Sequence, residues 1–230
     1  MKCIGLLGGM SWESTAEYYR LINREVARRL GGLHSARIVL ASVDFAEVAA
    51  LQASGDWDAA GRLLATQAAR LEGAGADLVL ICANTMHKVA DAVQDAIGVP
   101  LLHLADATAD AVRAAGITRV GLLGTAYTME QDFYRDRLAT HGLEVLVPDA
   151  DDRAEVHRTI YDELCRGEVL DESHRTHLAI IERLRARGAE GIILGCTELE
   201  LLLDPDADGS VPLFATTRIH ARAAVDAALA

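Results

Sequence analysis

The chain has 230 residues and a hydrophobic content of 51%, enough to bury a substantial core in one domain or in two small ones. Its formal net charge of −12 argues against broad binding to nucleic acids or anionic membranes, because both need a cationic face. No apolar stretch is long enough to span a bilayer, and the N-terminus turns polar at Ser11, too early for a secretory signal. We therefore expect a cytoplasmic protein.

Taken in chain order, short apolar runs alternate with amphipathic runs from end to end. The runs predict strands at residues 3–7, 37–43, 78–82, 101–104, 120–123, 143–147, 192–194 and 213–214. Helical patterns include residues 12–30, 57–71, 106–115, 129–141 and 216–229, and a Gly closes each of the first four. This alternation is typical of parallel sheets covered by helices on both faces, in which ligands bind at the carboxyl ends of the strands.

Half of the chain duplicates the other half. IGLLGG at residues 4–9 returns as VGLLGT at 120–125, VPLL at 99–102 returns as VPLF at 211–214, and LVLICANTMH at 78–87 matches GIILGCTELE at 191–200. The offsets are all about 112 to 116 residues. We expect one half-domain at 1–98, completed by the C-terminal segment 213–230, and a second at 99–212. Matching loops would then face each other across one cleft.

The duplicated loops differ in chemistry, because one has Cys196 where the other has Ala83. A thiol at the point where a strand gives way to a helix is a candidate acid/base, since helix N-termini favour the reactive thiolate. The alternative is an ordinary core cysteine. Asn84 or Thr85 would cap the helix that follows Ala83. Cys82 should face away from the loop by strand alternation.

The loop GLLGGMS at residues 5–11 lacks the spacing of a dinucleotide or P-loop fingerprint. It is either a tight turn or a turn whose N–H groups hold a small carboxylate at a helix start. Its duplicate, GTAYTM at 124–129, favours the second interpretation, because Thr125 and Thr128 add hydroxyl donors.

Cysteine and lysine usage narrows the possible cofactors. The four cysteines are Cys3, Cys82, Cys165 and Cys196. They form no CxxC pair and have no His at zinc-finger spacing, so we expect neither a disulfide framework nor structural zinc, and we interpret Cys3 and Cys165 as packing residues. Lys2 is terminal and Lys88 lies in an expected helix, so neither suits a pyridoxal phosphate Schiff base. We expect no cofactor.

These motifs together resemble the aspartate/glutamate racemase family, in particular its broad-specificity and L-selective amino-acid racemase branch. The matching segments are GLLGGMSWEST at 5–15, GGLHSA at 31–36, SVDF at 42–45, CANTMHKVADA at 82–92, ADAT at 105–108, LLGTAYTMEQDFYR at 122–135 and GCTE at 195–198. The resemblance covers the whole chain. It implies two pseudo-symmetric flavodoxin-like half-domains of α/β class, with a small amino acid in the cleft between them.

The resemblance also implies a reaction without pyridoxal phosphate or metal, in which two residues on opposite faces of the α-carbon remove and return a proton. Carried over by position, Cys196 is one acid/base and Ala83 stands at the place of the other. The loops expected to hold the amino acid contribute Met10, Ser11, Gln52, Asn84, Thr85, Thr125, Thr197 and Glu198. We expect a homodimer that binds a small amino acid.

Two positions depart from the family pattern. Where most relatives have Cys and the L-selective branch has Thr, this chain has Ala83, which can neither give nor take a proton. Where relatives commonly read Phe-Asp-Thr, this chain has Phe214, Ala215 and Thr216. The alternatives to a racemase are therefore a one-base lyase or decarboxylase of the same superfamily, a non-catalytic amino-acid-binding homologue, or an active-site variant in which Ala83 was introduced.

Overall fold

The computed structural model describes residues 1–208 and 210–230. The chain forms two compact units, one of Met1–Leu104 with His220–Ala230 and the other of Ala105–Ile219, here called the first and second units. The first unit extends to Leu104. Within this segment the Leu102 N–H donates to the Val79 carbonyl, across 2.9 Å, which attaches it to the first sheet. The sequence predicts these boundaries after residue 98 and before residue 213.

The first unit contains a parallel sheet with the order β2-β1-β3. Its strands are β1 (Ile4–Gly8), β2 (Ile38–Ser42) and β3 (Leu78–Ile81). Its helices are α1 (Trp12–Leu30), α2 (Phe45–Ser54), α3 (Trp57–Gly73), the 3₁₀ turn η1 (Thr85–Val89) and α4 (Ala90–Gln94). All three strands end at the same edge, so the loops after Gly8, Ser42 and Ile81 lie together.

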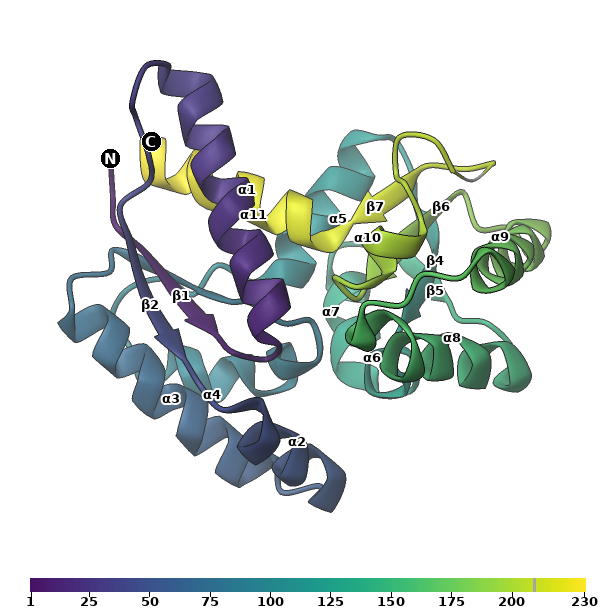
Figure 1. Cartoon of the computed structure of the whole chain (residues 1–230), viewed down its shortest axis with the longest axis horizontal. Helices are drawn as coiled ribbons and strands as arrows, with labels where there is room; N and C mark the ends of the chain where they lie inside the picture. Colours follow the sequence, from purple (N-terminus) through teal and green to yellow (C-terminus); the bar gives the residue numbers. More distant parts are fainter. Residues whose placement is uncertain (209) are drawn as a thin grey trace. The chain divides into compact units, whose positions relative to one another are not determined.

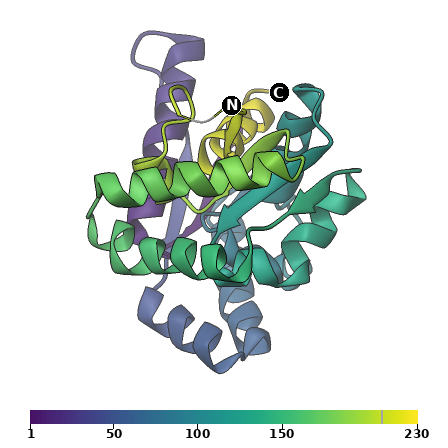
Figure 2. The ribbon, with the colours of Figure 1, turned by 90° about the vertical axis from the view of Figure 1, so that its right-hand side faces the viewer.

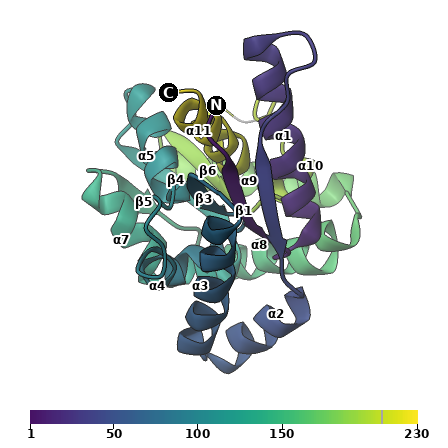
Figure 3. The same ribbon diagram turned by 90° about the vertical axis from the view of Figure 1, so that its left-hand side faces the viewer.

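Helices cover both faces of this sheet (Figure 1). On one face, Leu64 and Ala68 of α3 pack with Ile81 of β3 in a buried cluster, and Figure 3 shows α3 running along the strands. On the other face, Ile22 of α1 packs with Val225 of α11 (Thr216–Leu229). Both faces are therefore apolar, as expected for parallel strands.

The second unit contains a parallel sheet with the order β5-β4-β6-β7. Its strands are β4 (Arg119–Gly124), β5 (Glu144–Leu146), β6 (Gly191–Gly195) and β7 (Leu213–Ala215). Its helices are α5 (Leu104–Ala114), α6 (Ala126–Glu130), α7 (Asp132–Thr140), α8 (Ala150–Asp162), the 3₁₀ turn η2 (Leu164–Arg166), α9 (Asp171–Ala186) and α10 (Leu199–Leu202). Figure 2 shows α8 and α9, in green, side by side; Ile160 and Ile180 on these helices pack with Ile192 of β6.

The two sheets repeat the same pairing pattern. In the second unit, Ile192 pairs with Leu213 at the start of the β6–β7 ladder. In the first unit the equivalent pair is Val79 and Leu101, which form a single parallel bridge. The strand expected at 101–104 is therefore wrong beyond Leu101, because α5 already begins at Leu104. The α/β class and the two helix-flanked parallel sheets are confirmed.

Several expected boundaries also need correction. The helix expected at 129–141 is two helices, because the chain is extended at Gln131 (φ −92°, ψ 147°), between α6 and α7. Gly73 is the last residue of α3, and the left-handed residue after it is Gly75. Among the residues that the structure describes, no helix combines the length and the apolar character needed to cross a membrane.

Candidate functional site

The loop after β1 is fixed by two glycines and a threonine. A side chain at Gly8 would overlap Thr15, and one at Gly9 (φ 89°) would overlap the backbone of Val43. In place of a side chain, the Gly9 N–H donates to Oγ1 of Thr15 at 2.8 Å, and that hydroxyl donates to the Ser11 carbonyl at 2.8 Å. Ser11 also caps α1 by accepting from Ser14 N–H at 3.3 Å. The loop is therefore a rigid turn at a helix start.

The loop after β3 lies beside it in the same unit. Ser14 Oγ donates to the Cys82 carbonyl at 3.1 Å. Cys82 has no exposed surface, and burial raises the pKa of its thiol, so this thiol stays protonated within the core. Ala83 is 9% exposed and packs in an apolar cluster. Asn84 precedes η1 without a side-chain cap, which corrects the expectation that it caps a helix.

Two further expected residues of the first unit lie close to the Ala83 loop. Gln52 is 8% exposed, and its Nε2 donates to Sδ of Met86 at 3.0 Å. Met10 packs in the same buried cluster as Met86 and Ala83. Met10, Ala83 and Met86 thus share one buried cluster, and Gln52 contacts Met86.

In the second unit, Cys196 follows β6 and is 8% exposed. Its Sγ donates to Oε2 of Glu198 at 2.9 Å. Burial, with the adjacent Glu198 carboxylate, raises the pKa of the Cys196 thiol well above its usual range. The expectation that a helix start stabilises the thiolate is wrong, because α10 has four residues and a carboxylate is the nearest charge. The resting group is a thiol paired with a carboxylate, an arrangement that can move a proton.

The loop after β4 lies next to the Cys196 loop. Thr125 caps α6 by accepting from Thr128 N–H at 3.4 Å. A side chain at Gly124 would approach the Gly195 carbonyl oxygen to 3.1 Å, so the two strand ends are in close contact. Thr128 is fully buried and contacts the Thr125 hydroxyl at 3.3 Å. Its hydroxyl therefore supports Thr125 and does not face a ligand.

Residues after β7, which were not among the expected site residues, hold the Cys196 loop in place. Thr216 Oγ1 donates to the Leu194 carbonyl at 2.8 Å, and Thr217 Oγ1 donates to Oγ1 of Thr197 at 3.1 Å. Both threonines are fully buried. Arg218 adds an ion pair to Glu200 at 3.0 Å. Thr216 and Thr217 could have been identified as candidates from the sequence, because they are two adjacent polar residues directly after a predicted strand. Strand ends in parallel sheets commonly form ligand sites.

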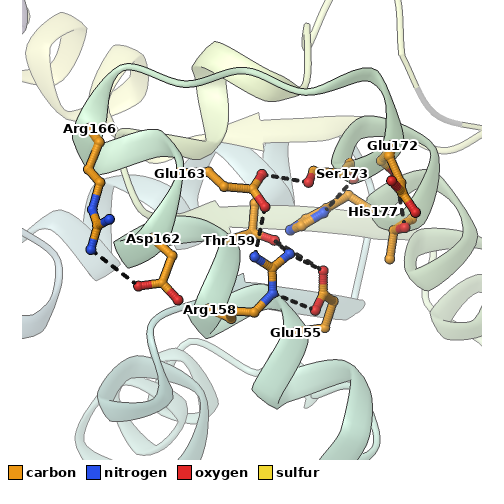
Figure 4. Close-up of polar contacts among 10 residues, drawn as sticks. Glu155, Arg158, Thr159, Asp162, Glu163, Arg166, Glu172, Ser173 and His177 are labelled. Carbon is orange, nitrogen blue, oxygen red and sulfur yellow. Dashed lines mark hydrogen bonds and ion pairs between the residues drawn. The ribbon is translucent and has the colours of Figure 1, made fainter.

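An ionic cluster around the buried carboxylate of Glu163 braces the corner between α8 and α9 (Figure 4). Glu163, 6% exposed, accepts from Arg158 at 2.8 Å and from Ser173 Oγ at 2.5 Å. The corner carries η2, whose Leu164 packs in the same cluster as Cys196. Cys165 on η2 is exposed, which corrects its interpretation as a packing residue. This cluster could not be predicted from the sequence, because its members lie on separate helical patterns typical of exposed surfaces.

Across residues 1–208 and 210–230, no group of three or more His, Cys, Asp or Glu side chains is arranged to hold a metal ion.

The family described as Asp/Glu/Hydantoin racemase matches residues 7–224. A crystal structure from Yersinia pestis classed with the Asp/Glu racemases is 55% identical over all of both chains, with a TM-score of 0.95. An aspartate racemase homologue from Pyrococcus horikoshii OT3 is 36% identical over all of both chains, with a TM-score of 0.88. The broad specificity amino-acid racemase RacX of Bacillus subtilis is 26% identical over 76% of this chain and 75% of its own.

Proposed function

Because the chain belongs to the Asp/Glu/hydantoin racemase family, we propose that it is a cofactor-independent enzyme of amino-acid racemase type in which Cys196 is the acid/base. The observation that carries this proposal is the hydrogen bond of 2.9 Å between the Cys196 thiol and the Glu198 carboxylate. The pair stands at the carboxyl end of β6, where parallel sheets place their ligands.

In the proposed reaction, the thiol proton passes to Glu198 and leaves a thiolate at Cys196. The thiolate takes the α-proton of the amino acid, so that the Cα–H bond breaks, an S–H bond forms, and the electron pair stays on the substrate as an enolate. Return of a proton to the α-carbon restores the amino acid. Because the pKa of the Cys196 thiol is raised, the thiol is the resting form, and its deprotonation by Glu198 must accompany substrate binding.

Ala83 stands at the duplicated position that corresponds to Cys196, and its methyl group cannot exchange a proton. We therefore propose that the second face of the substrate lacks its acid/base in this chain. On this account Cys196 removes and returns the α-proton on one face, and inversion is slow. A one-base lyase would share this asymmetry, and a non-catalytic binding protein would lack the exchange itself.

For the substrate's α-carboxylate, we propose contacts with the N–H groups and hydroxyls of Asn84, Thr85, Thr125 and Thr197. The helical elements that follow these residues are short: η1 and α6 have five residues each and α10 has four. Their macrodipoles are weak, so individual hydrogen-bond donors must hold the carboxylate. Met10, Ser11, Gln52 and Glu198 are proposed to line the rest of the site. A ligand-bound crystal structure with the carboxylate on an arginine would contradict this assignment.

We also propose that the protein works as a cytoplasmic homodimer. Exposed apolar side chains in the first unit support self-association: Trp12 is 66% exposed, and Leu40 on the edge strand β2 is 50% exposed. Large exposed apolar groups often mark a protein interface. Light scattering on the purified protein at several concentrations measures the mass directly, and a monomer throughout would refute the dimer.

Incubation with a panel of L- and D-amino acids in deuterated water tests the proposed function. Proton NMR follows loss of the α-proton signal, and chiral chromatography follows the appearance of the opposite enantiomer. We expect exchange without comparable inversion for at least one amino acid. Equal rates of exchange and inversion would indicate a complete two-base racemase, release of carbon dioxide from a malonate-type acid would indicate a decarboxylase, and tight binding with neither reaction would indicate a binding protein.

A further inference from the structure

His87 bridges two backbone segments of the first unit from within the core. It is 3% exposed. Its Nδ1 lies 2.8 Å from the Ala83 carbonyl oxygen, and its Nε2 accepts from the Leu104 N–H at 3.1 Å. The side chain thus connects the loop after β3 to the start of α5.

These partners define the tautomer of the ring. A backbone N–H can only donate, so Nε2 must be the unprotonated nitrogen, and a carbonyl oxygen can only accept, so Nδ1 must carry the hydrogen. The same reasoning applies to His220, whose Nε2 donates to the Leu102 carbonyl at 2.8 Å and whose Nδ1 therefore accepts from the Tyr18 hydroxyl at 2.8 Å. Both rings are neutral in this hydrogen-bond pattern.

The surroundings of His87 oppose a positive charge. The ring centroids of His103 and His220 lie 4.6 Å and 5.8 Å from that of His87. Burial, followed by these two histidines, holds the pKa of His87 well below its usual range. A second proton would also displace the Leu104 N–H from Nε2. Protonation of His87 therefore breaks a contact as well as burying a charge.

We infer that His87 is a positioning residue, held as the neutral Nδ1–H tautomer, which sets the orientation of the peptide group between Ala83 and Asn84. This inference rests on the proposed function, in which the Asn84 N–H contacts the substrate carboxylate. The peptide group is planar and trans, so its C=O and N–H point in opposite directions. By holding the Ala83 carbonyl toward the core, His87 directs the Asn84 N–H away from it.

The same geometry removes His87 from the proton-transfer chemistry. It is the first candidate to replace the missing acid/base beside Ala83, because it lies one turn away. Its Nδ1 hydrogen is committed to the Ala83 carbonyl, however, and its Nε2 lone pair is committed to Leu104. Neither nitrogen is available to a substrate, so His87 acts on the reaction through the backbone.

Two variants separate the two hydrogen bonds of His87, because each keeps a polar atom near the position of one ring nitrogen. In His87→Asn, the side-chain amide N–H can take the place of Nδ1 and still donate to Ala83, whereas the contact to Leu104 is lost. In His87→Gln, the side-chain carbonyl can reach the position of Nε2 and accept from Leu104, whereas the donor to Ala83 is lost. We expect His87→Gln to raise KM by about threefold to tenfold, the usual scale for one hydrogen bond, and His87→Asn to recover most of that loss. Equal losses in both variants, or loss of inversion alone, would overturn the inference.

The tautomer can be tested without any assay of activity. Long-range proton–nitrogen correlation spectra of the ¹⁵N-histidine-labelled protein distinguish a protonated from an unprotonated ring nitrogen. We expect His87 to show a protonated Nδ1 and an unprotonated Nε2 at neutral pH, in the unchanged protein and in Cys196→Ser alike. A ring that is protonated on Nε2, or that titrates near neutral pH, would refute the inference. Because Cys196→Ser tests the acid/base assignment and leaves this spectrum unchanged, failure of the proposed function and failure of this inference are distinguishable.

Discussion

The thiol of Cys196 donates a hydrogen bond to Oε2 of Glu198 across 2.9 Å, two residues along the same loop. The carboxylate therefore has two opposing effects on the thiol. Its charge, together with burial, raises the pKa of Cys196, and its position makes it the nearest group that can receive the thiol proton. A thiol with a raised pKa can still act as a base if a neighbouring carboxylate accepts its proton when the substrate binds.

Replacing Glu198 separates these two effects. In Glu198→Gln, the thiol pKa should fall, because the neighbouring negative charge is gone, but exchange of the α-proton should also fall by about a hundredfold, since no acceptor is left. Thiolate absorbance against pH, taken as a difference from Cys196→Ser, measures the pKa, and NMR in deuterated water measures exchange. Glu144→Gln is the matched control, because Glu144 is exposed on β5 in the same unit and pairs with Arg119; its exchange rate should stay near that of the unchanged protein. Exchange that survives in Glu198→Gln would mean that the proton leaves by another route.

The buried histidines make the first unit sensitive to acid. Burial lowers the pKa of His220 from 6.5 to about 4, so between these values the unfolded chain binds the proton and the folded chain does not. The stability is therefore complete above about pH 6.5 and is lost as the pH falls toward 4, by roughly 2–4 kcal/mol for this group. Urea unfolding between about pH 3 and about pH 7.5, which extends about one unit beyond both pKa values, measures the slope. His220→Gln should flatten the slope and the exposed His34→Gln should not; identical slopes for all three proteins would contradict the assignment.

The duplication made most of the fold predictable, because the same strand and loop appeared twice in the sequence. The pairing of Val79 with Leu101 repeats that of Ile192 with Leu213, in agreement with the matching VPLL and VPLF segments. The exact residue at which a helix or strand ends was harder to predict. Residues 129–141 have an unbroken helical pattern, yet the backbone turns extended at Gln131, which only its tertiary surroundings decide.

The candidate site was predictable where loops follow strands and unpredictable where side chains support those loops. Cys196 and Ala83 could be found from strand ends alone. The thiol's partner and its raised pKa could not, because the expectation of a thiolate assumed a full helix after Cys196 and α10 has four residues. Thr217 and His87 act across long sequence separations, on Thr197 and on Leu104. Single-sequence patterns carry little information on such contacts.

Restoring a donor beside the second face should separate exchange from inversion. If Cys196 is the single acid/base at the α-carbon, Ala83→Thr or Ala83→Cys should raise the rate of inversion by about two to four powers of ten, with little change in exchange. Chiral chromatography and NMR on the same samples measure the two rates. Adding Cys196→Ser to either variant serves as the control and should abolish the gain. Inversion in the unchanged protein that already equals that of the restored variants would show that another group serves this face.

The most direct measurement is the rate at which deuterium replaces the α-proton of an amino acid in the unchanged protein and in Cys196→Ser. The serine keeps the shape of the side chain but is a much weaker acid, so exchange should fall by at least about a hundredfold. Cys3→Ser is the matched control, because it makes the same thiol-to-hydroxyl change at a cysteine of the other unit, and it should leave exchange unchanged. Equal exchange in the unchanged protein and in Cys196→Ser would contradict the assignment of Cys196 as the acid/base.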